Sequence, residues 1–137
     1  MINSFDELYK EMVMKFLHSM IRVKDIKKSL DFYEKILGLK VVEKMELEDS
    51  NLYFLSDGYG DVQLELTENF ETPQNGYVNG NAFGHFAFAT DSFDDFSKRL
   101  KEHGYEYLWE PFWLDGAKSK IAFVKDPDGN EIEIIEK

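Results

Sequence analysis

The chain has 137 residues, a length typical of one domain or of two very small units that share a core. Its 16 basic and 27 acidic residues give a formal net charge of −11, which argues against nucleic acid as a partner. It contains no cysteine, so disulfides and thiolate ligands are excluded and a metal site must use His, Asp, Glu or backbone oxygens. No apolar run approaches a membrane span and no signal-peptide pattern opens the chain, so we expect a cytoplasmic protein without a membrane partner.

The first half of the chain is expected to begin with a helix at 1–13, where Ser4 and Glu7 have the spacing of a capping box. Segment 15–23 is expected to be a strand and 25–38 an amphipathic helix, because its apolar residues recur on one face. Further strands are expected at 39–47, 51–58 and 61–69.

A polar stretch at 70–81 carries a proline and two Asn-Gly pairs and is expected to be a loop. After this loop the order of elements restarts, with a strand at 82–90 and a helix at 91–104. The last expected elements are a strand at 105–112 that breaks at Pro111 and a hairpin over 120–137. The sequence therefore predicts an α+β chain in which one unit, a strand, a helix and three strands, occurs twice.

Each half places one histidine on its first strand and one glutamate on its last. His18 precedes Glu65 by 47 residues, and His85 precedes Glu133 by 48. A single histidine in the middle of an apolar strand such as "FGHFAFAT" is usually a buried structural residue, and a single strand glutamate is usually exposed. Four such residues at matched repeat positions favour a divalent metal site instead. A set without sulfur leaves coordination positions for water or substrate, and nickel, cobalt, zinc and manganese are all chemically reasonable.

The chain resembles the glyoxalase I (lactoylglutathione lyase) family of the vicinal oxygen chelate superfamily in the segments "FLHSMIRVKDIKKSLDFYEKILGLKVV", "LELTEN", "FGHFAF" and "IAFVKDPDGNEIEIIE". The resemblance implies two βαβββ modules and a homodimer with metal sites built between paired modules. It divides the chain into an N-terminal helical extension at 1–13, a first module at 14–70, an inter-module loop at 71–81 and a second module at 82–137.

The resemblance also implies an activity, the isomerisation of the methylglyoxal–glutathione hemithioacetal to S-lactoylglutathione. In this reaction a metal-stabilised enediolate forms and a carboxylate transfers the proton. The compact bacterial form of the family implies nickel or cobalt in preference to zinc or manganese. Carried over by position, the metal ligands are His18, Glu65, His85 and Glu133.

Further roles are carried over from the family to single residues. Glu133 is favoured as the principal base, and Glu65 is a ligand that could serve the other stereoisomer. Arg22 and Asn69 match positions that hold the γ-glutamyl end of glutathione, and an arginine fork suits a carboxylate.

Three alternatives remain open. Asp115 stands where related bacterial sequences tend to carry a lysine, so the co-substrate could be another small thiol. Another metalloenzyme of the superfamily, such as an epimerase, is the second alternative, although an epimerase would be expected to carry Gln in place of Glu65. The third is a metal-free protein that sequesters a ligand, like the bleomycin-resistance proteins, and metal analysis would distinguish it.

Overall fold

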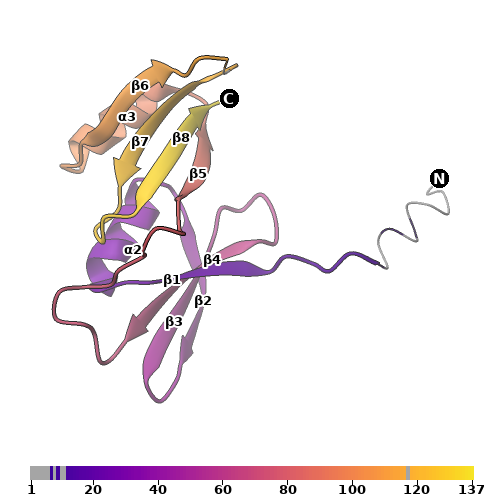
Figure 1. Cartoon of the computed structure of the whole chain (residues 1–137), viewed down its shortest axis with the longest axis vertical. Helices are drawn as coiled ribbons and strands as arrows, with labels where there is room; N and C mark the ends of the chain where they lie inside the picture. The colour runs from indigo at the N-terminus through magenta and orange to yellow at the C-terminus, as the bar shows by residue number, and fades with distance from the viewer. Residues whose placement is uncertain (1–6, 8, 10–11, 117) are drawn as a thin grey trace.

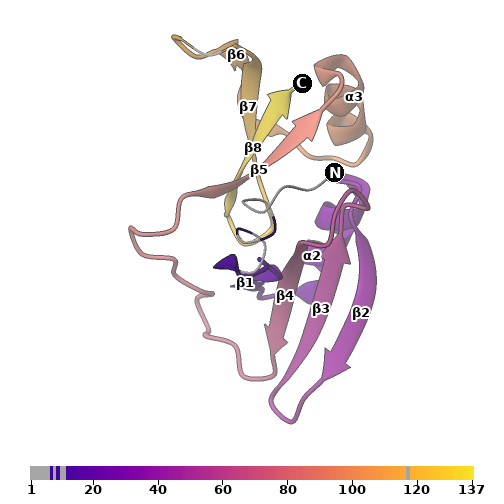
Figure 2. The same cartoon turned by 90° about the vertical axis from the view of Figure 1, so that its right-hand side faces the viewer.

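The computed structural model describes residues 7, 9, 12–116 and 118–137, which form two βαβββ modules, one above the other in both views (Figure 1; Figure 2). The first module contains β1 (His18–Arg22), α2 (Ile26–Lys35), β2 (Lys40–Glu46), β3 (Ser50–Ser56) and β4 (Gln63–Asn69). The second contains β5 (His85–Thr90), α3 (Phe93–Glu102), β6 (Tyr107–Trp113), β7 (Lys120–Lys125) and β8 (Glu131–Glu136). The predicted α+β duplication is confirmed. Most of the helix predicted at 1–13 lies outside the described residues.

The two sheets have the same topology, with strand order β1-β4-β3-β2 in the first and β5-β8-β7-β6 in the second. In each sheet the first strand of the module pairs in parallel with the last, and the other neighbours are antiparallel. This topology places each histidine-bearing strand directly beside the strand that carries the matching glutamate.

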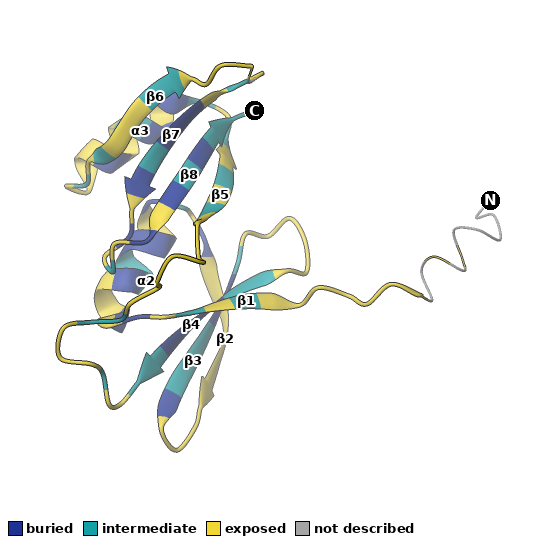
Figure 3. Cartoon of the chain, viewed as in Figure 1, coloured by how far each residue is buried: buried dark blue, intermediate teal, exposed yellow. Residues whose placement is uncertain are grey.

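Both helices begin at side-chain caps that the sequence supplies. The Asp25 carboxylate accepts hydrogen bonds from the backbone N–H groups of Lys27 and Lys28, and the Ser92 hydroxyl accepts one from Asp95. Each helix then buries one apolar stripe against its sheet (Figure 3). The buried side chains are Ile26, Phe32 and Tyr33 in α2, and Phe93, Phe96 and Leu100 in α3.

One hydrophobic core continues through both modules. It joins Phe32 and Tyr33 of α2 to Leu66 of the first sheet and to Val124 and Ile132 of the second sheet, all of them essentially inaccessible to solvent. The modules are therefore two small units that share a core. Within the described residues, no helix is long and apolar enough to cross a membrane.

A buried polar contact, which we call the Tyr33–Asp126 junction, fastens the second module to the first. The Tyr33 hydroxyl on α2 donates to Asp126 Oδ2 at 2.7 Å, in the turn between β7 and β8. The same carboxylate accepts from the backbone N–H groups of Asp128 and Asn130, and Asp128 in turn accepts from the backbone N–H of Lys24 at 2.9 Å. Burial and the adjacent carboxylate raise the pKa of Tyr33 far above its usual value. The junction therefore holds a neutral phenol against a fully hydrogen-bonded carboxylate.

The outer strands β2 and β6 are irregular. The predicted break at Pro111 is wrong, because β6 continues through it from Tyr107 to Trp113. Proline is tolerated there because β6 is an edge strand, and its pairing with β7 shifts register on both sides of Trp109. β2, the edge of the first sheet, has a register shift between Val41 and Glu43.

Candidate metal centre

Each sheet has one face packed against the core and one open face, and both predicted histidines lie on the open face. Burial alternates along β1, so that His18 and Arg22 are exposed. In β5, His85 is exposed while Phe86 and Phe88 pack against the core. His85 is the first residue of β5, and 40% of its side chain is exposed. His85 is therefore not the buried histidine in the middle of a strand that a lone histidine in such a segment would usually be.

The first module brings His18 and Glu65 together. The parallel register of β1 and β4 sets Met20 opposite Glu65, and His18 Nε2 lies 3.3 Å from Glu65 Oε1. Phe54, opposite Glu65 on β3, packs its ring against the imidazole of His18, with centroids 5.6 Å apart and planes 80° apart. Glu65 is only 7% exposed. This first pair is thus a half-exposed imidazole facing a buried carboxylate.

The second module repeats this geometry with His85 and Glu133. His85 Nε2 lies 3.5 Å from Glu133 Oε1, and Ala87 lies opposite Glu133 in the parallel register. Phe123 lies opposite Glu133 on β7 and packs on His85 with centroids 5.4 Å apart and planes 88° apart. The repeat detected in the sequence is therefore reproduced by imidazole, carboxylate and phenyl ring alike.

The two pairs differ in what holds the carboxylate. The Thr67 hydroxyl, two residues after Glu65, donates a hydrogen bond to Glu65 Oε2. Ile135 occupies the matching position after Glu133 and offers no donor. The exposed fraction of the side chain is 9% for Glu65 and 19% for Glu133. The first carboxylate is therefore the more enclosed and the more restrained.

The four predicted ligands are brought together as two pairs. Among the described residues, no group of three or more His, Asp or Glu side chains could hold a metal ion. Each pair nevertheless presents an imidazole nitrogen and a carboxylate oxygen to the same point, which is the donor chemistry of a borderline divalent ion. The residues of each pair therefore fit a divalent metal, with two donor groups in each module.

The predicted substrate-binding residues share the open face of the first sheet but line separate hollows. Arg22 pairs in register with Thr67 and lines a hollow of about 270 Å³ with Tyr77 and Phe83. Asn69 lines another hollow of about 520 Å³ whose other side chains include Glu48, Asp49 and Glu71. The Asn69 side-chain oxygen accepts from the Tyr77 hydroxyl at 3.4 Å.

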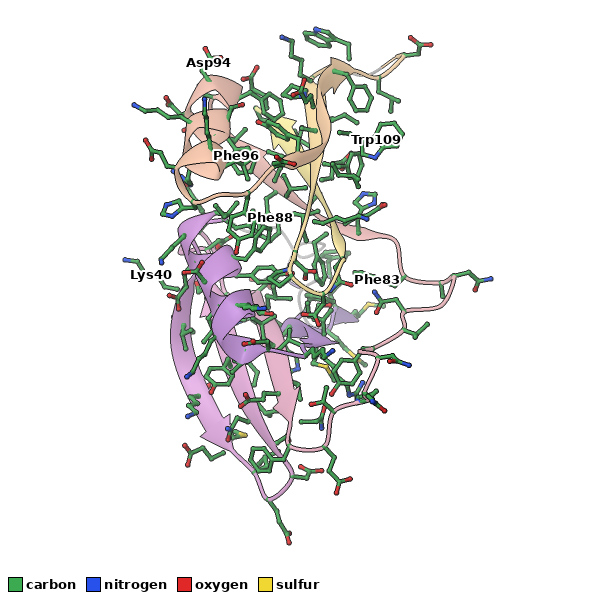
Figure 4. All side chains as sticks on the ribbon, turned by 90° about the vertical axis from the view of Figure 1, so that its left-hand side faces the viewer. Lys40, Phe83, Phe88, Asp94, Phe96 and Trp109 are labelled. Atoms are coloured by element: carbon green, nitrogen blue, oxygen red, sulfur yellow. The ribbon has the colours of Figure 1, made fainter. Side chains whose placement is uncertain are left out.

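Aromatic side chains extend the open face of the second sheet. Trp109 pairs in register with Phe123 and projects from the side of the sheet opposite Phe96 of α3 (Figure 4). It is 59% exposed, and Trp113 at the end of the same strand is 61% exposed. Phe112 pairs with Ile121, two residues before Phe123, and its ring centroid lies 6.4 Å from that of Trp109, so these two aromatic side chains form an apolar wall on the face that carries Glu133.

The sequence interpretation missed Thr67, Phe54 and Phe123 as parts of the site. A signal for Thr67 was present in "QLELT", because residues two apart on a strand share a face and the hydroxyl therefore lies beside the carboxylate of Glu65. The two phenylalanines could have been found only by aligning the third strand of each module.

The chain is similar to known proteins over most of its length. The family described as the Glyoxalase/Bleomycin resistance protein/Dioxygenase superfamily matches residues 15–134. A lactoylglutathione lyase of Neisseria meningitidis is 38% identical over 128 residues, covering 90% of this chain and 91% of that protein. A lactoylglutathione lyase of Escherichia coli O157:H7 is 35% identical over 127 residues, covering 90% and 93%.

Two solved structures of glyoxalase I are also similar. That of maize superposes with a TM-score of 0.81 at 30% identity, covering 96% of this chain and 47% of the maize chain, so this chain spans about half the maize length. The Leishmania major glyoxalase I, described as trypanothione-dependent, gives a TM-score of 0.73 at 31% identity and covers 90% and 87%.

Proposed function

The chain belongs to the Glyoxalase/Bleomycin resistance protein/Dioxygenase superfamily, and on that premise we propose that it is a metal-dependent lactoylglutathione lyase. It converts the hemithioacetal of methylglyoxal and glutathione into S-lactoylglutathione. The observation that carries the proposal is the pair of matching His–Glu half-sites on the open sheet faces. We also propose a cytoplasmic location, because the co-substrate is a reduced thiol and the cytosol keeps thiols reduced.

One divalent ion is held by His18, Glu65, His85 and Glu133 in a homodimer, where the first pair of one copy meets the second pair of another. Two observations support this arrangement. No described group of three ligands forms within one chain, and the Tyr33–Asp126 junction fixes the modules relative to each other. Nickel or cobalt is the proposed ion. When bound, it supplies Lewis-acid stabilisation of the negative charge that develops on the substrate oxygens.

The protein's own residues then move the proton. Glu133 removes it from the carbon that bears the sulfur and hydroxyl, and returns it to the neighbouring carbonyl carbon. Support for Glu133 comes from its greater exposure and from the small Ala87 opposite it, which leaves room for substrate. Glu65 remains a ligand. The Arg22 guanidinium and the Asn69 amide receive the polar γ-glutamyl end, and the Trp109 indole shields the reacting carbons from water.

Metal reconstitution tests the proposal. The protein is stripped with a chelator, loaded separately with nickel, cobalt, zinc or manganese, and assayed for thioester formation from methylglyoxal and glutathione. We expect activity with nickel or cobalt, and a dimer in gel filtration. Tight metal binding without thioester formation would contradict the lyase assignment with glutathione, and a purified protein that binds no metal would favour a sequestering protein.

A second candidate differs only in the thiol. The hollow beside Asn69 is lined by Glu48, Asp49 and Glu71, and the chain carries a net charge of −11. In this candidate the end of the thiol opposite the γ-glutamyl group occupies the hollow, and the acidic lining favours a cationic group there over a carboxylate. The test compares kcat/KM for glutathione and for glutathione amidated with a polyamine. A preference for the polyamine conjugate that disappears in Glu71→Gln would support the second candidate.

A further inference from the structure

We propose that Thr67 is a positioning residue, whose hydroxyl fixes the Glu65 carboxylate as a stationary ligand and thereby leaves proton transfer to Glu133. This inference rests on the proposed function and adds to it a physical cause for the division of labour between the two glutamates.

The contact divides the two oxygens of Glu65 between two tasks. Thr67 Oγ1 donates to Oε2, while Oε1 faces His18 Nε2 at 3.3 Å. Both residues are nearly inaccessible, with Thr67 5% and Glu65 7% exposed. A carboxylate held in this way cannot rotate without breaking a buried hydrogen bond to a charged group, which is among the stronger kinds.

The donor itself is rigid. Thr67 lies in β4, between β1 and β3, paired with Arg22 on one side and Leu52 on the other. A β-branched side chain on a central strand has few accessible rotamers, so the backbone of the sheet determines where the hydroxyl points. The position of Glu65 Oε2 is therefore set by the sheet and not by solvent.

The second module provides an internal control for this restraint. Ile135 stands two residues after Glu133, on a strand that is equally central and paired with Ala89 and Ile121. The distances from imidazole to carboxylate, 3.3 and 3.5 Å, and the ring contacts, 5.6 and 5.4 Å, otherwise match between modules. The hydroxyl of Thr67, which is absent from Ile135, is thus the feature that distinguishes the two otherwise similar His–Glu pairs.

The chemistry requires such a separation. A base that takes a proton from one carbon and returns it to the next must change its position, whereas a ligand that holds charge must not. Hydrogen bonds that orient metal ligands are typically worth about 10- to 100-fold in metal affinity or activity. Thr67 donates that bond to Glu65, which acts as a ligand only, whereas Ile135 has no donor for Glu133, which is both ligand and base.

The experiment exchanges the two side chains. The variants are Thr67→Val, which removes only the hydroxyl, Thr67→Ser as the conservative rescue, and Ile135→Thr, with Ile135→Val as its matched control. Nickel affinity of the metal-free protein is measured by competition with a chromophoric chelator, independently of turnover, and kcat and KM are measured with saturating nickel.

We expect Thr67→Val to weaken nickel binding about 10- to 100-fold while Thr67→Ser remains near the parent value. Ile135→Thr should not weaken nickel binding, but it should lower kcat severalfold relative to Ile135→Val, because Glu133, which is the base as well as a ligand, gains a restraint. Unchanged nickel affinity in Thr67→Val, or failure of Thr67→Ser to retain it in a folded protein, would overturn the inference. If Thr67→Val does not fold, the test rests on Ile135→Thr. A kcat of Ile135→Thr equal to that of Ile135→Val would then overturn the inference. Failure of the proposed function looks different, because the parent protein would then bind nickel and form no thioester.

Discussion

The two modules have the same order of helices and strands, but they differ in the side chains that hydrogen-bond to a buried carboxylate. Tyr33 lies eight residues after the helix cap Asp25, and its counterpart Leu100 lies eight residues after Ser92. Both are buried, but only the tyrosine carries a hydroxyl. Thr67 and Ile135 differ in the same way beside the glutamates. The duplicated backbone thus determines where the carboxylates lie, and a single hydroxyl group determines whether a neighbouring side chain hydrogen-bonds to each of them.

The turns after the third strand of each module also differ, because only the turn of the second module has a buried aspartate that contacts the other module. Asp126 follows Phe123 by three residues and is 4% exposed, with Tyr33 as a partner. Asp57 follows Phe54 by three residues, is exposed, and accepts a hydrogen bond from the backbone N–H of Tyr59 at 2.9 Å. The junction between modules is therefore built from the first helix and the second turn, and the reciprocal contact does not form between Leu100 and Asp57.

The largest expected effect comes from neutralising each glutamate in turn. Glu133→Gln should lower kcat by about 10²- to 10⁴-fold, the usual worth of a general base, while nickel remains bound. Glu65→Gln should act mainly on nickel affinity, because Glu65 is the restrained ligand. Stopped-flow or steady-state kinetics at saturating nickel measure the first effect and chelator competition the second. Equal losses of kcat in both variants would abolish the distinction between the two half-sites.

An intermediate effect is expected at the junction. Tyr33→Phe leaves the buried Asp126 carboxylate without its phenol donor and should lower the free energy of unfolding by about 1–3 kcal/mol. Asp57→Asn, the matched change on the exposed turn, should alter it by less than about 0.5 kcal/mol. Urea denaturation of the metal-free protein gives both values. A Tyr33→Phe variant as stable as the Asp57→Asn control would show that the junction adds nothing to the shared core.

The smallest effect is a pH dependence, also on the second turn. Burial raises the pKa of Asp128, with a contribution from the neighbouring Asp126, although the Lys24 N–H opposes it. The folded state therefore binds this proton more tightly than the unfolded state. The stability gained from protonating Asp128 is complete below the pKa of this carboxyl in the unfolded state, about 3.9. It is lost as the pH rises through the higher pKa of the folded state. Asp128→Asn should gain stability relative to the parent over this window, as measured by urea denaturation at successive pH values. Parallel curves for the two proteins would contradict the raised pKa.

Much of this arrangement followed from local sequence. The equal spacing of His18–Glu65 and His85–Glu133 reports a duplicated backbone, which places each pair on adjacent strands whatever the rest of the fold does. Whether the four residues gather in one chain depends on how the modules are fixed. That depends on Tyr33 and Asp126, which lie 93 residues apart, and no local pattern links them.

Pro111 failed as a strand breaker for a related reason. A proline ends a strand only where its missing N–H would have had a partner, and the sequence alone does not say which strand forms the edge of a sheet. Edge position, like the arrangement of the modules, is a tertiary property. The candidate ligands could thus be predicted, whereas their distribution over two half-sites could not.

The irregular outer strands have a consequence for how copies of this chain associate. β6 carries Pro111 and shifted pairing, and β2 carries a register shift and several charged side chains, so neither edge is a good template for adding another chain's strand. The edges formed by β1 and β5 are paired regularly, without such interruptions, and they carry the histidines. These irregular outer edges therefore disfavour the strand-by-strand addition of further copies that would lead to fibrous aggregates.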